Sequence, residues 1–547
     1  MNDLIFEKIL HSLLIWGFPV HLFKIVSFAL VFNLSAYPQI KKVNEFTSSN
    51  LPIIVIDTHG QTVVDEPKIT ATIGIINNGP DSINNITDPF TDYNGWIGIE
   101  LRGNSTQTLF PKKPYLFETR DSSGENLDVS LLGMPEDNDW ILLASYIDRT
   151  FIRDPLAHYL SALMGSWSSR CRFCEVVVNN EYLGVYILTE KIKRGKNRVD
   201  IKKLEPDDTS SARITGGYIY EVTGFGGDFG ENRLLHYPKP EDITEDQLNY
   251  IKNYDDNFRI SMLLPSYSDS VYGYEKWINT DSFIDEILIQ ELMRNGDAYG
   301  WSAYFHKNRD DKLEAGPAWD FDQSSGNSSL RDGEKTSGWI LDYGGYQPFF
   351  WKMLFKEKKF NSRLRLRWNE LRKNNFSDKN ILSFIDSCAY YLEQAQERNF
   401  EKWPILGVFT WRETIGYQNR DTYQKEVDYL KSFMTARAEW MDNQLKLETT
   451  AITSEINSLP DNFYLYQNFP NPFNPGTKIS YTLDKRAMVQ LKVYDILGRE
   501  IEMLVSEIQN AGRYSYEFNA EKLVSGIYFY KLTAGNSTAT RKMVLLK

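Results

Sequence analysis

Three aspartates in two short motifs carry the most chemical information in this 547-residue sequence. Asp297 ends the motif Arg-Asn-Gly-Asp, directly after a helical pattern, and Asp320 and Asp322 lie in the motif Trp-Asp-Phe-Asp. Residues 303–318 between them have the pattern of a β-hairpin, which would return Asp320 close to Asp297. Neighbouring carboxylates repel one another, and a bound Mg²⁺ removes that penalty. We expect one carboxylate to orient a hydroxyl while another holds the metal, unless Asp320 and Asp322 only cap a turn.

A polar turn elsewhere in the sequence fits phosphate binding. It consists of Arg102, Gly103, Asn104 and Ser105, between the end of one predicted strand and a second strand that starts with Lys112-Lys113. Exposed backbone N–H groups in such a turn can hold phosphate oxygens, and a lysine on the next strand can reach the same phosphates. The alternative is an ordinary polar hairpin with solvated lysines.

The elements that must position these residues change in character along the chain. Residues 51–119 are β-rich, and the residues 174–188 have the pattern of a hairpin. Helical spacing dominates after residue 282, and the predicted helices are 148–163, 283–293, 349–373, 381–402 and 423–447. A β-rich part followed by a helical part is an α+β, two-lobed layout. The last 90 or so residues alternate in short strands, predicted at 478–483, 489–494, 514–518, 526–532 and 541–546, which is typical of a small all-β sandwich.

Composition and cysteine spacing exclude some classes of function. The formal net charge is −12, so we expect no nucleic-acid partner, because binding of phosphate backbones needs a basic surface. Cys171 and Cys174 form a single CxxC pair, and no second pair of cysteines or histidines follows to complete a zinc site. A local disulfide or two packed thiols is the expected state of this pair.

The N-terminus has the pattern of an export signal. Lys24 precedes about ten apolar residues that end in Ser35-Ala36, which is typical of a signal peptide. A membrane anchor is the alternative, but both N-terminal apolar stretches are short for a span. No later segment is long and apolar enough to cross a membrane, so we expect no transmembrane span in the mature chain.

Several motifs occur in the order found in CotH-type kinases, the atypical kinases named after spore coat protein H. Residues 51–447 resemble this family, and the motifs that carry the resemblance are Arg102-Gly-Asn-Ser, Lys112-Lys-Pro-Tyr, Trp140-Ile-Leu-Leu-Ala, Asp148 to Arg153, Tyr182 to Glu190, Asn295-Gly-Asp297 and Trp319-Asp-Phe-Asp322. The resemblance implies a two-lobed, protein-kinase-like domain with a β-rich N-lobe and a helical C-lobe. It also implies binding of ATP and Mg²⁺ and phosphorylation of Ser or Thr on secreted or coat proteins.

The resemblance also implies roles for single residues. Lys113 would bind the ATP phosphates with Glu190 as its carboxylate partner, next to the turn formed by Arg102, Gly103, Asn104 and Ser105. Asp297 resembles the catalytic aspartate and Asp320 the metal-binding one, with Asp322 beside it. Protein kinases have a metal-binding asparagine five residues after the catalytic aspartate, whereas this chain has Ser302. A hydroxyl is a weaker Mg²⁺ ligand, so an inactive kinase-like fold is an alternative.

The C-terminal segment has a second, separate resemblance. Repeated Asn-Pro pairs in residues 463–475 favour stiff turns, and they are followed by Val493-Tyr-Asp-Ile-Leu-Gly-Arg and Gly526-Ile-Tyr-Phe-Tyr-Lys. Residues 459–547 closely resemble the type A sorting domain of the type IX secretion system. This resemblance implies that the secretion machinery is a partner and that the protein reaches the outside or the cell surface of a Gram-negative bacterium.

Together these patterns predict a signal peptide (1–36), a CotH kinase-like domain (37–450), a linker (451–459) and a sorting domain (460–547). The predicted function is transfer of phosphate from ATP to Ser or Thr of secreted or surface proteins. The alternatives are an inactive surface scaffold or adhesin, and transfer of a nucleotide by the same fold.

Overall fold

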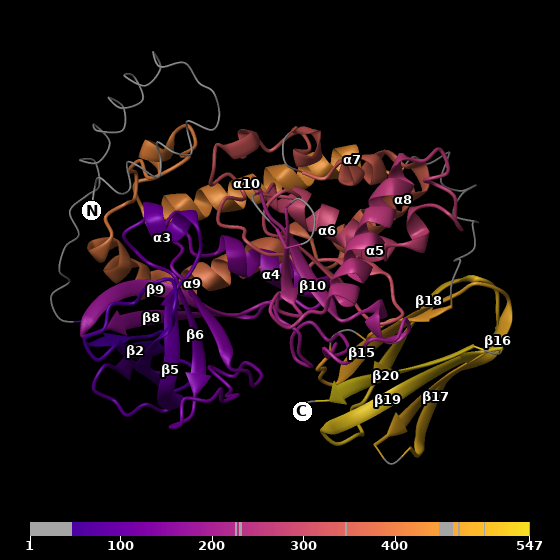
Figure 1. The fold of residues 1–547 in the computed structure, drawn as a ribbon, viewed down its shortest axis with the longest axis horizontal. Coiled ribbons are helices and arrows are strands. Elements are labelled where there is room, and N and C mark those ends of the chain that lie inside the picture. The colour runs from indigo at the N-terminus through magenta and orange to yellow at the C-terminus, as the bar shows by residue number, and fades with distance from the viewer. Residues whose placement is uncertain are drawn as a thin grey trace. The chain divides into compact units, whose positions relative to one another are not determined.

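The computed structural model describes residues 46–224, 227–228, 232–344, 347–447, 463–468, 471–496, 498–535 and 537–545. They belong to two compact units that divide between Leu445 and Lys446, and Figure 1 shows the elements of each. The predicted signal peptide (1–36) and linker (451–459) lie outside the described residues. The chain is α+β with an all-β C-terminal unit, which is the class that the sequence predicted.

Seven strands of the first unit close into a barrel in the order β2-β3-β5-β6-β7-β9-β8 (Figure 1). Neighbouring strands are antiparallel, except that β2 and β8 are parallel, with Ile53 opposite Glu175. The strands are β2 (Ile53–Asp57), β3 (Ile69–Ile76), β5 (Tyr93–Leu101), β6 (Tyr115–Arg120), β7 (Asp139–Leu143), β8 (Cys171–Val178) and β9 (Glu181–Glu190). Alternate side chains fill the interior with an apolar core, as the period of two along each strand requires.

The connections of the barrel differ in part from the prediction. The expected hairpin joins β8 to β9, and its two turn residues, Asn179 and Asn180, both have positive φ, as tight hairpin turns require. A short helix, α3 (Ser105–Leu109), stands in the polar stretch between β5 and β6, where only a turn was expected. Cys171 and Cys174 both lie in β8 as free thiols, so the predicted alternative of a disulfide is wrong.

Helices and a second, four-stranded sheet make up the rest of the first unit. The sheet has the order β11-β10-β12-β13, with β10 (Tyr218–Val222), β11 (Arg233–Tyr237), β12 (Ala303–Lys307) and β13 (Leu313–Ala315). The helices are α4 (Arg153–Leu163), α5 (Glu245–Leu263), α6 (Thr280–Met293), α7 (Phe349–Lys356), α8 (Lys358–Lys373), α9 (Asp378–Lys402) and α10 (Tyr423–Gln444). Among the described residues, no helix combines the length and the apolar composition that a membrane span needs.

Two of the predicted helices differ from the helices in the structure. The predicted helix 349–373 is two helices, because the chain breaks at Glu357, whose carboxylate accepts a hydrogen bond from the N–H of Phe360 (2.7 Å) and caps α8. The helix predicted over 148–163 begins only at Arg153. Asp148 instead accepts hydrogen bonds from the N–H groups of Thr150 and Arg153 and shapes the preceding loop.

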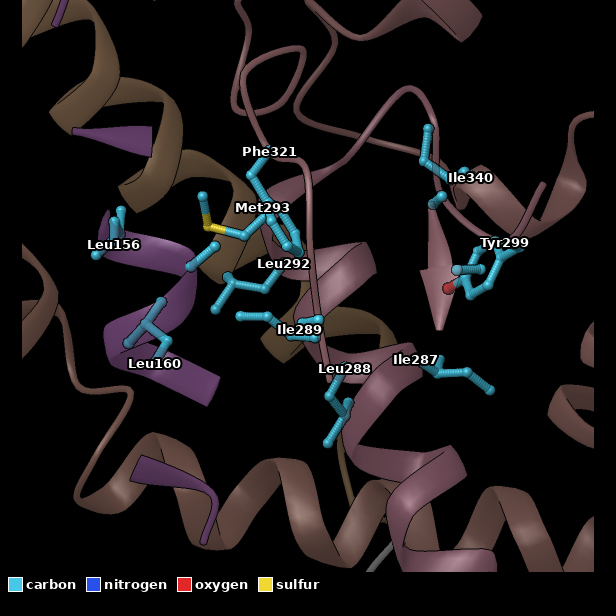
Figure 2. Packing of buried hydrophobic residues seen from close by; sticks show 14 of the residues in the cluster. Leu156, Leu160, Ile287, Leu288, Ile289, Leu292, Met293, Tyr299, Phe321 and Ile340 are labelled. Atoms are coloured by element: carbon cyan, nitrogen blue, oxygen red, sulfur yellow. The ribbon is translucent and has the colours of Figure 1, made fainter. Parts of the chain in front are cut away.

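One large apolar core joins the helices of this unit to β10 and β12. Figure 2 shows Leu292 and Met293 of α6 in the same packed group as Phe321 and the α4 residues Leu156 and Leu160. A smaller cluster packs the outer face of the barrel, including Leu116, against Tyr304 of β12 and against Trp319. This second contact brings the barrel up to the segment that carries Asp320 and Asp322.

The second unit consists of two antiparallel sheets, β14-β15-β18 and β17-β16-β19-β20. Their strands are β14 (Tyr464–Leu465), β15 (Gly476–Leu483), β16 (Ala487–Asp495), β17 (Glu500–Gln509), β18 (Gly512–Asn519), β19 (Gly526–Ala534) and β20 (Ser537–Leu545). Inward-facing side chains of both sheets share one apolar core. Only β14 and β17 of these strands were not predicted; β17 is mostly exposed and rich in charge, so it has little hydrophobic alternation.

Candidate functional site

The loop after α6 carries Asp297 and is tied to the segment that carries Asp320. The Oδ1 atom of Asn295 accepts a hydrogen bond from the N–H of Asp297 (3.1 Å), and its Nδ2 donates to the backbone carbonyl of Asp320 (2.9 Å). Asn295 therefore links the segment of Asp297 to the segment of Asp320 by hydrogen bonds. This is the juxtaposition that the hairpin pattern predicted, and β12 and β13 form that hairpin.

A buried phenylalanine anchors the second acidic segment. Phe321 is fully buried between Asp320 and Asp322 and packs in the helical core (Figure 2). Its backbone N–H donates to Oδ1 of Asp154 in the first turn of α4 (2.7 Å). The Oδ2 atom of Asp320 accepts a hydrogen bond from the Ser302 hydroxyl (2.9 Å), so Ser302 lies at the site, as predicted. No hydrogen bond to the Asp322 carboxylate is present within the described part of the chain.

Asp154 belongs to this cluster, although the sequence analysis missed it. Its side chain is buried, and its charge acts on Asp322. The preceding motif, Asp148 to Arg153, was noted only as part of the family resemblance. An acidic residue in the first turn of a helix is common because it complements the helix dipole, so its position alone did not mark Asp154 as part of a site.

Burial and mutual repulsion raise the pKa of every carboxyl in the cluster. Burial and the charge of Asp320 raise the pKa of Asp154 to about 7 and that of Asp297 to about 7. Burial also raises the pKa of Asp320. Burial and the charges of Asp320, Asp154, Asp297 and Asp148 raise the pKa of Asp322 well above its usual range. Full ionisation of the cluster would therefore leave an excess of negative charge, which a bound cation would stabilise.

Backbone strain is concentrated in the same loops. Arg294, Tyr299, Ser302 and Asp320 all have φ between 47° and 68°, a left-handed conformation that is costly for residues other than glycine. Such conformations persist where surrounding contacts enforce them, and they cluster at functional sites. Here they turn the chain sharply on both sides of the hairpin, at the positions that present Ser302 and Asp320.

The donor set of the cluster fits a magnesium ion that shares its coordination with phosphate. In the described ranges, no three His, Cys, Asp or Glu side chains are close enough to hold a metal ion by themselves. Mg²⁺, however, is usually bound by one or two carboxylates together with waters and substrate phosphates. Asp320 and Asp322 would supply these two carboxylates, with the Ser302 oxygen held beside the first of them.

Arg102 brings the predicted phosphate-binding turn to the edge of the acidic cluster. Its guanidinium lies 5.1 Å from the centre of the Trp319 ring, and its charge opposes the rise in the pKa of Asp154 and of Asp320. Gly103 has φ 88°, and a Cβ atom there would lie 2.2 Å from the Thr106 hydroxyl. Only glycine therefore fits this turn, which continues through the exposed residues Asn104 and Ser105.

The predicted lysine and its predicted carboxylate partner have other partners in the structure. Lys113 Nζ donates to the carbonyls of Gln107 and Phe110 (2.6 Å each). Glu190 forms ion pairs with Arg170 (2.6 Å) and Arg198 (2.8 Å). No contact between Lys113 and Glu190 is present among the described residues, so the structure does not bring these two predicted site residues together.

Lys112 points away from the exposed loop and into the protein. Its Nζ donates to the carbonyl of Val185 and to Oδ1 of Asn399 (3.0 Å), and it lies over the Tyr186 ring. The two lysines lie in the loop before β6, which begins only at Tyr115, so the prediction that this strand starts with Lys112-Lys113 is wrong. Lys112 joins the barrel to α9.

Models of two known protein families match most of the sequence. A family model described as CotH kinase protein matches residues 99–441, more than half of the chain. The chain belongs to the CotH kinase family. The matched range contains Arg102 and all the aspartates of the cluster, and it confirms the resemblance that was inferred from the motifs.

A second family model, described as Secretion system C-terminal sorting domain, matches residues 467–546 of this CotH family member. It confirms the second resemblance and lies within the all-β unit. The type IX secretion system therefore carries the protein to the cell surface or out of the cell.

Comparisons with individual proteins add little to these family matches. No curated protein matches the chain in sequence. Among solved structures, the twitchin kinase region from C. elegans is similar at 10% identity, with 90% of this chain and 98% of that chain covered, but with a TM-score of only 0.15. A similarity at this level carries no argument about the fold or the site.

Proposed function

We propose that this CotH family member is an exported protein kinase that transfers phosphate from ATP to a Ser or Thr hydroxyl of a secreted or surface protein. The observation that carries the proposal is the cluster of Asp154, Asp297, Asp320 and Asp322, whose excess negative charge calls for a cation. The family match supports a kinase-related domain, and export of the chain by its sorting domain supports substrates that lie outside the cell. In this proposal, the barrel is the β-rich lobe and α5 to α10 belong to the helical lobe.

Each group of the site has a separate task in this proposal. Asp320 and Asp322 would hold Mg²⁺, which neutralises charge on the ATP phosphates when bound. Ser302 orients the Asp320 carboxylate by its hydrogen bond. Arg102 lies at the edge of the cluster and binds phosphate oxygens, beside the turn formed by Gly103, Asn104 and Ser105. Lys113 and Glu190 remain predicted nucleotide-binding residues, and Lys113 would have to exchange its loop carbonyls for phosphate.

Asp297 acts on the acceptor in this proposal. Its Oδ2 atom already accepts a hydrogen bond from Gln323 (2.6 Å), which leaves Oδ1 for the acceptor hydroxyl. The acceptor oxygen forms a bond to the γ-phosphorus while the bond from that phosphorus to the β–γ bridging oxygen breaks, and ADP leaves. The hydroxyl proton passes to Asp297, a group with a pKa of about 7 that is suited to general-base catalysis near neutral pH.

Titration of the purified protein with ATP, with and without Mg²⁺, tests the proposal when it is combined with mass spectrometry of an acceptor protein after incubation. We expect Mg²⁺-dependent ATP binding and a product that carries phosphate on Ser or Thr. A product that carries AMP instead would establish nucleotide transfer by the same fold. Absence of nucleotide binding would leave an inactive surface scaffold as the function.

A further inference from the structure

Two arginines, Arg331 and Arg412, lie beside Asp297. The guanidinium of Arg331 is 5.2 Å from the centre of the Trp301 ring, and that of Arg412 is 4.1 Å from the centre of the Trp411 ring. The charges of both arginines oppose the rise in the pKa of Asp297. Stacking on an aromatic face restrains a guanidinium while leaving its edge free to donate hydrogen bonds.

Hydrogen bonds to the segments that carry Asp297 and Asp320 fix the positions of both guanidiniums. Arg412 Nη1 donates to Oε1 of Gln323 (3.0 Å), the residue whose amide donates to Asp297. Arg331 Nη1 donates to the carbonyl of Ala298 (3.0 Å), the residue directly after Asp297. Two segments far apart in the sequence thus place positive charge next to the same carboxylate.

Neither arginine has a carboxylate partner within the parts of the chain that are described. Other arginines of the unit do: Arg437 pairs with Glu291 (3.0 Å), and Arg153 pairs with Asp148 (2.6 Å). Both Arg331 and Arg412 are partly exposed. Each guanidinium has five N–H donors, and a single donor of each is used in the hydrogen bonds described above. The remaining donors are available to an anion.

Charge is divided between the two ends of the acidic cluster. The charge of Arg102 acts on Asp154 and Asp320, at the end that would hold metal and nucleotide. The charges of Arg331 and Arg412 act on Asp297, at the end that would hold the acceptor. An anion bound by the second pair would therefore belong to the acceptor and lie close to its reacting hydroxyl.

We propose that Arg331 and Arg412 form a binding site for an anionic group of the acceptor, a carboxylate or a phosphate that lies near the phosphorylated hydroxyl. This inference rests on the proposed function for the identity of the acceptor end. It assigns a substrate class: Ser or Thr within an acidic segment, or within a segment that already carries phosphate. Guanidinium groups match both carboxylate and phosphate geometry, so the shared chemistry is an anion recognised by two arginines.

Three peptides of identical length test the site, with Asp, Asn or phosphoserine next to a single acceptor serine. Binding is measured by fluorescence anisotropy without ATP, and transfer is measured as kcat/KM with Mg²⁺ and ATP. The unmodified protein should bind the Asp or the phosphoserine peptide about tenfold or more tightly than the Asn peptide, because charge-assisted hydrogen bonds are the strong ones. The comparison of the two anionic peptides shows whether carboxylate or phosphate is preferred.

The double variant Arg331→Gln/Arg412→Gln should reduce this preference to about one. The ratio between peptides is the readout, because any effect of the substitutions on Asp297 itself acts on all three peptides alike. Arg194→Gln is the matched control: Arg194 is also stacked on an aromatic ring, Tyr237 at 5.3 Å, and its loss should leave the ratio unchanged. Arg331→Lys/Arg412→Lys keeps both charges and should retain part of the preference.

The outcomes separate this inference from the proposed function. An anion preference in binding that the double variant abolishes supports the site, even if no peptide is phosphorylated, in which case the proposed kinase activity fails alone. Absence of preference in the unmodified protein overturns the site. Equal loss of kcat/KM for all peptides, with unchanged binding ratios, also overturns it, because the arginines would then act on the transferred phosphate.

Discussion

The aspartate loops and the lysine-bearing turn were both chosen from the sequence as parts of one site, and the structure treats them differently. Asp297, Asp320 and Ser302 come together, and within the described residues neither aspartate forms an ion pair. Lys113 and Glu190 are each satisfied by other groups, Lys113 by nearby carbonyls and Glu190 by two arginines. Charged side chains that already have partners contribute to the fold, whereas a cluster of uncompensated carboxylates requires a ligand. The unpaired cluster is therefore the stronger evidence of function.

The sharpest test of this comparison is the variant Asp320→Asn. If Asp320 holds the metal, its substitution should lower phosphate transfer by about 10³-fold or more, because metal stabilisation of the transferred charge amounts to several kcal/mol. ATP affinity in the presence of Mg²⁺ should fall to the value measured without it. Calorimetric titration and a transfer assay measure both effects. Full activity of Asp320→Asn would show that the site is placed wrongly.

Asp297→Asn should separate chemistry from nucleotide binding. We expect transfer to fall by about 10²- to 10⁴-fold, the usual contribution of a positioned general base, while the affinity for Mg·ATP stays nearly unchanged. The reason is that Asp297 acts on the acceptor and contributes in the transition state. A parallel loss of ATP affinity would instead make Asp297 a ligand of the nucleotide or its metal.

The same variant should change how stability depends on pH. The pKa of Asp297 is about 7 in the folded protein, whereas an unfolded aspartate titrates near pH 4. Between these values the folded state retains a proton that the unfolded state has lost, so stability falls as pH rises through this window. Asp297→Asn should therefore raise the melting temperature above pH 7 in the absence of metal, with a gain that vanishes near pH 4. Thermal unfolding with a chelator present at pH 4, 6 and 8 measures it, and a gain independent of pH would contradict the argument.

The smallest effects are expected for substitutions of Lys112 and Lys113. Substitution of Lys112 should mainly change stability, whereas substitution of Lys113 tests nucleotide binding. Lys112→Met should lower the free energy of unfolding by about 1–3 kcal/mol, because it removes a buried donor from the Val185 carbonyl. Lys113→Met should cost less stability, because its site is partly exposed. Denaturant unfolding measures this contrast. An ATP titration then decides the predicted role of Lys113: weaker binding by Lys113→Met alone would keep it in the nucleotide site, and unchanged binding by both variants would remove it.

The parts of the site that the sequence predicted are those fixed by local geometry. The hairpin of β12 and β13 spans few residues, so its pattern alone indicated that Asp320 returns toward Asp297. Arg102 was also found, because it begins a polar turn that contains a glycine. The partners of Glu190 come from loops outside the family motifs, and nothing in the local pattern around Glu190 indicates which charge it will meet.

The residues that the sequence did not reveal are held by long-range packing. Asp154 reaches the cluster because α4 packs on α6 (Figure 2), and Arg412 reaches Gln323 from the segment between α9 and α10. The sequence predicted the α+β class and the helices other than α3 and α5, because apolar periodicity is a local property. The closure of the barrel was not predicted, since it depends on a parallel pairing between strands that are distant in the sequence.

That pairing governs how the first unit can be assembled. β2 finds its second neighbour only in β8, so every hydrogen bond between Ile53–Ile56 and Glu175–Val178 must wait until the intervening strands are in place. Contacts between such distant segments slow folding because the loop entropy is lost before the pairing is gained. Until closure, β2 and β8 each present an open edge, the feature by which strands of separate chains associate. A chain truncated before Cys171 would lack β8 and keep the edge of β2 permanently exposed, whereas the closed barrel has no edge through which two copies can join.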